Sequence, residues 1–224
     1  MGNMKRTVTP ELLDTDSGAP AEVATALSDL QRINRWFGGI ATTEEMVGRV
    51  ARAMNASSLS LLEVAAGSGY VQEIVRQRQG ARGLRLEVTL LDRAPSHLSN
   101  GNRAVVANAL ALPFRDESFD LVSCTLFAHH LGPHEFLQFI VEALRVCRVA
   151  VLINDIVRHP LHLALVYAGL PLFRSRITRH DGPVSVRRAY TPEEMRTFLA
   201  QSTAARTELH RHHLFRMGVT AWKY

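Results

Sequence analysis

The sequence has 224 residues, of which 46% are hydrophobic, and a formal net charge of +5 at pH 7. This length suits a single domain with a sizeable core. No apolar run reaches about 18 residues, so we expect no membrane span. The first residues also lack the apolar core of a signal peptide, and we therefore expect a cytoplasmic protein.

The basic charge is only a weak indication of a nucleic-acid partner. Lysine occurs only at Lys5 and Lys223, and the arginines are scattered along the chain instead of forming a block. Aromatic residues are not interleaved with them, as they are in proteins that stack bases. We therefore expect no nucleic-acid partner.

Disulfide and metal sites are not expected from the sequence either. Cys124 and Cys147 both lie in apolar stretches, which favours buried thiols. His210, His212 and His213 have no nearby cysteine or matched acid, so an exposed turn explains them better than a metal site.

The N-terminal quarter predicts an arm followed by two helices. Residues 1–19 are polar and predict a loose arm. Apolar residues at helical spacing predict a helix over 21–37, and Thr42 or Thr43 can cap a second helix that ends at Met54. The stripe expected to be buried in the first helix consists of Leu27, Leu30, Ile33, Trp36 and Phe37.

The rest of the chain is organised around residues 61–70, with the sequence LLEVAAGSGY. Its apolar residues predict a strand that is buried on both faces, with Glu63 near the carboxyl end. Gly67 and Gly69 then permit positive φ and let a ligand approach the backbone closely. Because a helix follows, the turn lies where open α/β sheets bind ligands.

This turn fits the dinucleotide fingerprint G-x-G-x-x-G poorly. Counted from Gly67, the third glycine would fall at Gln72, and counted from Ala65, the first glycine is missing. The mismatch weakens a nicotinamide oxidoreductase interpretation without excluding it.

Further strands continue the pattern. Residues 86–91 predict the next strand, and Asp92 closes it 23 residues after Gly69, about the spacing at which an acid meets a ribose. Residues 104–112 predict a short strand that runs into a loop, and residues 119–124 predict a fourth strand.

In this order, the segments resemble the motif series of the small-molecule class I S-adenosylmethionine (SAM) methyltransferases, in the group that contains the ubiquinone and menaquinone methyltransferases. The resemblance covers about residues 58–155. Ala65 stands where the acid-glycine pattern more commonly has a glycine, and Asn108 where many relatives have an aspartate. The resemblance implies SAM as the cofactor, held by Glu63, Ala65, Gly67, Ser68, Gly69, Asp92, Arg93, Asn108, Ala109, Leu110, Cys124 and Thr125.

The loop after the fourth strand carries two adjacent histidines, His129 and His130. Imidazole titrates near neutral pH and can take a proton from a phenol or enol, so these are the candidate catalytic residues. His130 is the better placed of the two, and a packing role for the pair is the alternative.

The segment after a predicted helix over 133–145 and a fifth strand over 149–153 is expected to bind the acceptor. Residues 159–173 predict an apolar helix over the pocket or at a partner surface, and residues 174–190 predict a polar, turn-rich loop. The alternative is that Asp181 pairs with an arginine and so holds the loop in place. The candidate substrate-binding residues are Asn154, Asp155, Arg158, His180, Arg187 and Tyr190.

Thr191 and Pro192 begin the last main helix, and residues 206–211 and 214–222 predict an antiparallel hairpin. We therefore expect an α/β fold, a Rossmann-like seven-stranded mixed sheet with helices on both faces and this C-terminal antiparallel hairpin. One domain over 1–224 is expected, with an N-terminal helical cap at about 20–54 and a substrate-side insertion at about 156–190.

The resemblance implies methyl transfer to oxygen, carbon or nitrogen of a small, mostly apolar acceptor, such as a phenolic or polyketide-like metabolite. A non-catalytic SAM-binding or partner protein, a nucleic-acid methyltransferase and a nicotinamide oxidoreductase are the alternatives. The sequence leaves open the acceptor and the oligomeric state, including a homodimer.

Overall fold

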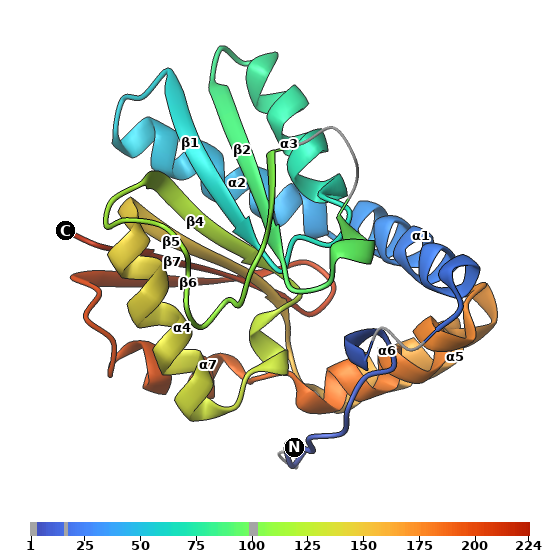
Figure 1. Ribbon diagram of the computed structural model, residues 1–224. Helices are drawn as coiled ribbons and strands as arrows, with labels where there is room; N and C mark the ends of the chain where they lie inside the picture. The colour runs from blue at the N-terminus through green and yellow to red at the C-terminus, as the bar shows by residue number, and fades with distance from the viewer. Residues whose placement is uncertain (1–3, 16–17, 99–102) are drawn as a thin grey trace.

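A seven-stranded sheet with the order β3-β2-β1-β4-β5-β7-β6 forms the centre of the computed structural model, which describes residues 4–15, 18–98 and 103–224 (Figure 1). Strands β1 to β5 are parallel to one another, and β7 is antiparallel to both β5 and β6. The predicted Rossmann-like fold with a C-terminal antiparallel hairpin is confirmed. The strands are β1 (Ser58–Val64), β2 (Arg85–Asp92), β3 (Arg103–Val106), β4 (Phe119–Thr125), β5 (Cys147–Ile156), β6 (Arg206–His212) and β7 (Arg216–Trp222).

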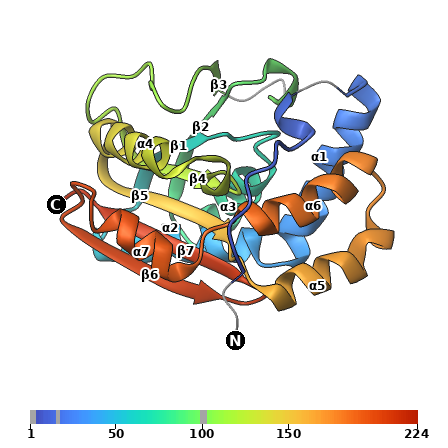
Figure 2. The same ribbon diagram turned by 90° about the horizontal axis from the view of Figure 1, so that it is seen from below.

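Helices cover both faces of the sheet (Figures 1 and 2). The α-helices are α1 (Pro20–Trp36), α2 (Gly39–Ala53), α3 (Tyr70–Gly80), α4 (Pro133–Val146), α5 (Pro160–Gly169), α6 (Arg176–Arg188) and α7 (Pro192–Leu199). Short 3-10 helices are η1 (Leu13–Thr15), η2 (Pro95–His97), η3 (Ala128–His130) and η4 (Leu170–Leu172). None of these described helices is both long and apolar enough to cross a membrane.

Two apolar clusters, one on each face, hold the layers together. Neighbouring side chains of a strand point to opposite faces, so Leu61 packs with α2 and α3 whereas Leu62 packs with α4 and α7. Both cysteines are free and buried, as predicted, Cys124 at the end of β4 and Cys147 at the start of β5.

Helices α1, α5 and α6 form a third group beside the sheet (Figure 2). Helix α6 packs against both α1 and α5, and α1 also contacts α2 and α3. The turn-rich loop predicted for 174–190 is wrong, because α6 occupies most of it. Ser175 caps this helix by accepting a hydrogen bond from the amide of Ile177, and Pro183 lies inside it.

The N-terminal prediction also needs correction. Residues 4–15 are not a loose arm: the backbone amides of Leu12 and Leu13 donate to the carboxylate of Asp181 on α6, at 2.8 and 3.0 Å. Residues 1–3 and 16–17 of the predicted arm lie outside the described residues. Helix α2 begins at Gly39, not at the predicted threonine cap, because Gly38 reverses the chain with φ of 79°.

The predicted apolar stripe of α1 is not buried in a core. Trp36 and Phe37 are 57% and 40% exposed, and the whole stripe lines a cavity described below. The residues of α1 that are buried are Val23, Ala26, Asp29 and Asn34. Periodicity located the apolar face of the helix correctly, but it could not distinguish a face that packs on protein from one that faces a ligand pocket.

Arg216 on β7 joins the sheet to the α1–α2 junction. Its fully buried guanidinium donates to Asn34 Oδ1 at 2.9 Å, to Asn154 Oδ1 at 3.0 Å and to the carbonyl of Phe37 at 2.9 Å. Burial lowers the pKa of this guanidinium to about 10.

We expect Arg216→Ala to lower the free energy of unfolding by about 2 kcal/mol or more, because it leaves buried acceptors unpaired. Arg85→Ala is the control: this side chain is 76% exposed in an ion pair with Glu87, and its loss should change stability by less than about 1 kcal/mol. Urea unfolding of both variants measures the difference, and equal effects would contradict the prediction.

Candidate active site

A cavity of about 1110 Å³ lies at the carboxyl ends of the parallel strands. Its lining comes from the turn after β1, the ends of β2 and β4, the N-terminal segment and helices α1, α5 and α6. Ligand pockets commonly measure about 300–1,000 Å³, so this cavity has room for two ligands side by side. Ligands of open α/β sheets bind at this edge.

The glycine turn forms one wall. Ala65, Gly67 and Gly69 all have positive φ, of 54°, 53° and 69°. Gly69 begins α3, and a Cβ built there would lie 2.4 Å from Leu90 Cδ1, so only glycine fits. Ala65 adopts the left-handed conformation despite its side chain, at the position where the family pattern commonly has glycine.

Asp92, at the end of β2, fixes this turn. Its carboxylate accepts hydrogen bonds from the amide of Gly67 at 2.8 Å and from the amide of Ala94 at 3.0 Å. Beside it, Arg93 donates to the backbone carbonyl of Asp14 at 2.9 Å. Asp92 therefore lies on the cavity wall next to the turn, as the spacing predicts.

Glu63 lies at the end of β1 and is 1% exposed, yet its carboxyl group lines the cavity. Burial raises the pKa of this carboxyl to about 7, against the opposing effect of hydrogen bonds from Ser123, Thr125 and Gln72. The hydroxyl of Ser123, on the adjacent strand β4, donates to Glu63 Oε2. A positively charged ligand group beside this carboxyl would favour its ionised form.

The loop after β3 forms the neighbouring wall. Asn108 Oδ1 accepts a hydrogen bond from the amide of Leu110 at 3.0 Å, and both residues line the cavity together with Ala109. Ser68 and Thr125 line it as well, whereas Cys124 is buried and lies outside the lining. The structure thus brings together on one cavity wall all the predicted cofactor residues except Gly69 and Cys124, which are not in the lining.

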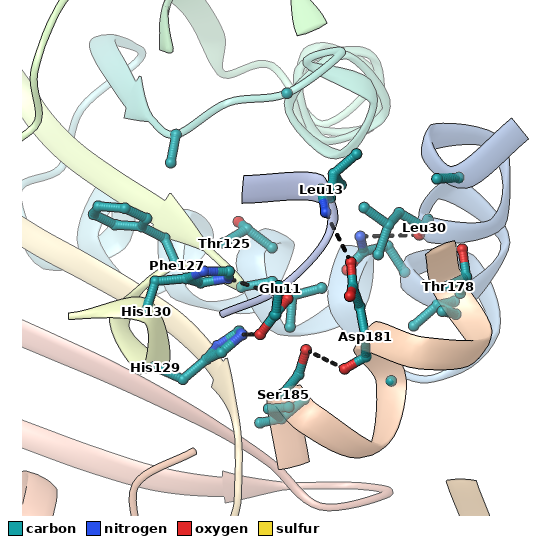
Figure 3. A pocket seen from close by; sticks show the side chains of 18 of the residues that line it. Glu11, Leu13, Leu30, Thr125, Phe127, His129, His130, Thr178, Asp181 and Ser185 are labelled. Atoms are coloured by element: carbon teal, nitrogen blue, oxygen red, sulfur yellow. Dashed lines mark hydrogen bonds and ion pairs between the residues drawn. The ribbon is translucent and has the colours of Figure 1, made fainter. Parts of the chain in front are cut away.

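His129 and His130 lie on η3 at the opposite end of the cavity (Figure 3). Nδ1 of His129 lies 2.7 Å from Asp155 Oδ1, and Nδ1 of His130 lies 3.0 Å from Asp14 Oδ2. Burial disfavours a charge on His129, but Asp155 and Glu11 outweigh it and raise the pKa to about 10. His129 is therefore protonated near neutral pH and cannot itself accept a proton.

The predicted substrate-binding residues are dispersed. Among the residues that the structure describes, the cavity lining includes none of the six. Asn154 donates to Thr43 Oγ1 and Arg158 to Glu194, while His180 is paired with Asp181. Asp155 holds His129 from behind, Arg187 donates to the hydroxyl of Tyr167, and the hydroxyl of Tyr190 donates to the carbonyl of Leu131.

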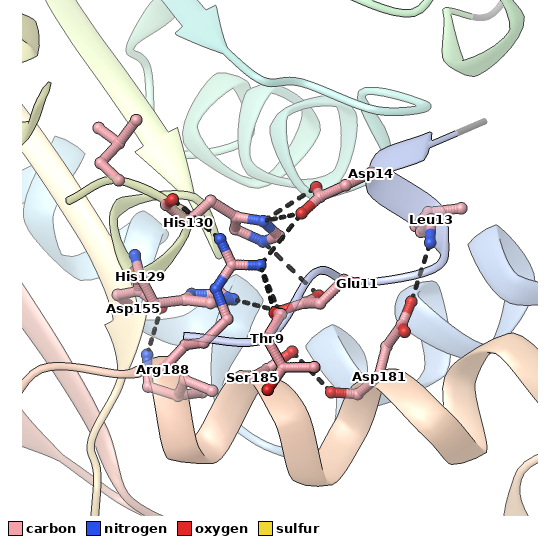
Figure 4. Close-up of polar contacts among 12 residues, drawn as sticks. Thr9, Glu11, Leu13, Asp14, His129, His130, Asp155, Asp181, Ser185 and Arg188 are labelled. Atoms are coloured by element: carbon pink, nitrogen blue, oxygen red, sulfur yellow. Dashed lines mark hydrogen bonds and ion pairs between the residues drawn. The ribbon is translucent and has the colours of Figure 1, made fainter. Parts of the chain in front are cut away.

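Two acidic residues of the site, Glu11 and Asp14, were not found from the sequence. Glu11 is 6% exposed and approaches both histidines, and Arg188 contacts Asp14 at 3.1 Å (Figure 4). Each is separated from its partners by many residues along the chain. The only sequence signal was the presence of two acids in a segment otherwise interpreted as a loose arm.

Comparison with known proteins identifies the cofactor-binding part of the chain. Residues 62–152 match a family described as a methyltransferase domain. This match supports a SAM-dependent methyltransferase. The match begins at the glycine-turn strand and ends in β5, so this methyltransferase domain contains both the acid-glycine turn and Asp92.

Solved structures of methyltransferases share the fold of this chain. A SAM-dependent methyltransferase from Aquifex aeolicus is 15% identical, with a TM-score of 0.60 over 93% of this chain and 100% of that chain. The plantazolicin methyltransferase BpumL, in complex with a monoazolic desmethylPZN analog and SAH, is 11% identical, with a TM-score of 0.67 over 93% and 91% of the two chains. Magnesium protoporphyrin IX methyltransferase (ChlM) from Synechocystis PCC 6803, with bound SAH, is 15% identical, with a TM-score of 0.55 over 84% of each chain. No curated protein matches the sequence.

The raised pKa of Glu63 predicts how SAM binding depends on pH. If the ammonium group of SAM lies near Glu63, it stabilises the carboxylate, so affinity should rise with pH by up to about tenfold per unit below pH 7 and level off above it. Glu63→Gln should bind SAM more weakly at pH 7.5 (about tenfold) and lose this dependence. Calorimetric titration across this range tests both, and a variant with the wild-type pH profile would contradict the assignment.

Gly69→Ala tests the packing of the turn. The added methyl group would clash with Leu90 and force alanine into a left-handed conformation, so we expect a loss of about 1–3 kcal/mol in stability and weaker SAM binding. Gly80→Ala is the matched control on the same helix, since a Cβ there meets nothing within 4 Å. Thermal unfolding and SAM titration of the pair should separate them, and equal behaviour would argue against the steric role of Gly69.

Proposed function

We propose that this methyltransferase transfers a methyl group from SAM to a small, mostly apolar acceptor, of which a phenolic or polyketide-like metabolite is the best candidate. The observation that carries the proposal is the single cavity wall formed by the glycine turn, Glu63 and Asp92, which continues into an apolar chamber. The acceptor atom is oxygen, carbon or nitrogen, and a phenol oxygen fits the site best because acidic and basic groups lie at its far end.

The cofactor would occupy the wall built from the turn after β1 and the ends of β2 and β3. Its amino acid part would lie against Glu63 and the glycine turn, its ribose near Asp92, and its adenine near the Asn108 loop. The lining leaves room for this group at the turn. Gly67 has no Cβ, and a Cβ built there would meet only Leu27, at 4.0 Å, so the space beside this backbone is open. When bound, SAM supplies a sulfonium methyl group that is already a good electrophile.

The acceptor would fill the side of the cavity toward α1, α5 and α6. This side is mostly apolar, and the residues of these helices that line it include Leu27, Leu30, Ile33, Leu165, Val166 and Ile177. Burial of an apolar body there contributes about 25 cal/mol per Å² and excludes water from the transfer. The main task of the protein is to align the acceptor with the methyl group.

We place loss of the acceptor proton at the histidine pair. His130 lines the cavity, and its ring is held by Asp14 on one side and stacks with Phe127 at 6.3 Å on the other. His129 is the positioning residue behind it, with ring centroids 4.2 Å apart. In this proposal, residues at about 20–54 form the helical cap, and residues at about 156–190 form the substrate-side insertion. Both belong to one domain, and the protein is cytoplasmic.

The structural neighbours agree with a small-molecule acceptor. BpumL was solved with a monoazolic desmethylPZN analog, and another neighbour is described as the CurJ carbon methyltransferase. At 11% identity these proteins support the range of acceptors that such a fold accommodates, not a particular acceptor.

The test combines binding with turnover. Calorimetry should show SAM binding that Asp92→Ala weakens by at least about tenfold, since it removes a charged acceptor, while Asp116→Asn at a 75% exposed position leaves it unchanged. Mass spectrometry should then show addition of one methyl group to members of a panel of phenols and polyketide-like compounds.

Each negative outcome has a distinct meaning. Absence of SAM binding would overturn the proposed function. SAM binding without methylation of any panel member would favour a non-catalytic SAM-binding protein, and strong, salt-sensitive RNA or DNA binding would favour a nucleic-acid methyltransferase.

A further inference from the structure

Three side chains that can bind metal converge at the far end of the cavity. Nε2 of His129 lies 3.6 Å from Glu11 Oε1, and Nε2 of His130 lies 3.7 Å from Glu11 Oε2 (Figure 4). One ligand atom from each of the three lies within 4.8 Å of the others. Donor atoms bound to one Zn²⁺ at about 2.0–2.1 Å lie about 3 to 4 Å apart, so a small adjustment brings these atoms to coordinating distance.

The atoms that face one another are buried without being satisfied. Among the residues described, Glu11 Oε1 and His129 Nε2 have no hydrogen-bond partner, although their side chains are 7% and 3% exposed. A buried polar atom without a partner destabilises the folded state. At 3.6 Å, Glu11 Oε1 and His129 Nε2 form an ion pair but not a hydrogen bond. A ligand bound between these two atoms would give each of them a partner.

The outer nitrogen of each ring is held by a carboxylate. Asp155 holds Nδ1 of His129 at 2.7 Å, and Asp14 holds Nδ1 of His130 at 2.9 Å. Metal-binding histidines almost always donate their other ring N–H to such a group, which fixes the tautomer and turns Nε2 toward the ion. Both histidines here have this arrangement.

The charges around the cluster also favour a cation. The carboxylates are Glu11, Asp14 and Asp155, and the guanidinium in contact with them is that of Arg188, 3.7 Å from Glu11 Oε1. Arg6 lies behind the histidines and donates to the backbone carbonyls of His129 and Leu131. Three carboxylates face these two guanidiniums, so an ion that replaces the proton of His129 enters surroundings with a net negative charge.

We propose that Nε2 of His129, Nε2 of His130 and the carboxylate of Glu11 bind one divalent transition-metal ion. Two imidazoles and one carboxylate favour Zn²⁺, Fe²⁺, Mn²⁺ or Co²⁺ over Mg²⁺ or Ca²⁺, which prefer oxygen ligands. The ion would replace the proton on Nε2 of His129. Three protein ligands leave coordination positions open, and all three residues line the cavity.

The ion would add a catalytic role to the function proposed above. Only this catalytic role rests on the proposed function, whereas metal binding itself does not. An acceptor oxygen at an open position would release its proton to solvent water more readily, as water does when it is bound to zinc. Because coordination occupies the lone pair of His130 Nε2, the ion and not the imidazole would promote this loss.

The binding test requires no turnover. Metal-stripped protein is titrated with Zn²⁺, Co²⁺ and Mn²⁺ by calorimetry, the bound metal is counted by mass spectrometry, and Co²⁺ is followed by its visible absorption. We expect about one ion per chain, at least tenfold weaker binding in Glu11→Gln and His130→Ala, and about 10–100-fold weaker binding in Asp14→Asn. His134→Ala, at an exposed position on α4, should bind as the wild type does.

SAM binding by the same variants controls for folding and separates this inference from the proposed function. Variants that bind SAM normally but have lost the metal support the site. Absence of a stoichiometric ion in wild-type protein, or an ion that His130→Ala and Glu11→Gln still bind normally, would overturn it and leave a buried ion-pair cluster. Activity that survives complete metal removal would overturn the catalytic consequence alone.

Discussion

The hydrogen bond from the amide of Gly67 to the carboxylate of Asp92 is the interaction on which the cofactor side depends. It joins the ends of β1 and β2, which are adjacent parallel strands, and it holds a turn in which three residues have positive φ. Glycine adopts this conformation without strain, but alanine does not, so at Ala65 it persists only where the surroundings enforce it. The same carboxylate also holds Ala94, so Asp92 organises the backbone on both sides of the strand end before any ligand is considered.

The acceptor side is organised in another way, by side chains from distant parts of the chain. Asp29 on α1 accepts hydrogen bonds from the amides of Arg174 and Ser175, which fixes the start of α6. Asp181 on α6 then holds the amides of Leu12 and Leu13, and these fix Glu11 opposite the histidines. One wall of the cavity is thus positioned by the strand ends of the sheet. The other is positioned by hydrogen bonds to the carboxylates of Asp29 and Asp181.

The first wall could be predicted from the sequence and the second could not. The Glu63, Gly67, Gly69 and Asp92 positions follow from short-range spacing, since strand ends and glycine turns are local features. Glu11 meets His129 and His130 only through tertiary packing, and neither periodicity nor spacing reports that. The glycine and proline of α6 indicated a turn, but Ser175 caps the helix and Ile177 and Val186 bury its apolar face, which outweighed that local signal.

The N-terminal segment is part of the cavity wall, with Val8, Pro10 and Glu11 among its lining residues. It is held by hydrogen bonds from its own backbone and from Arg6, and also by ion pairs of Glu11 and Asp14 with the two histidines and Arg188. Detachment of this segment would open that side of the cavity, and it would at the same time withdraw Glu11 from the two histidines. An open cavity and a complete Glu11–histidine cluster are therefore mutually exclusive states of the protein.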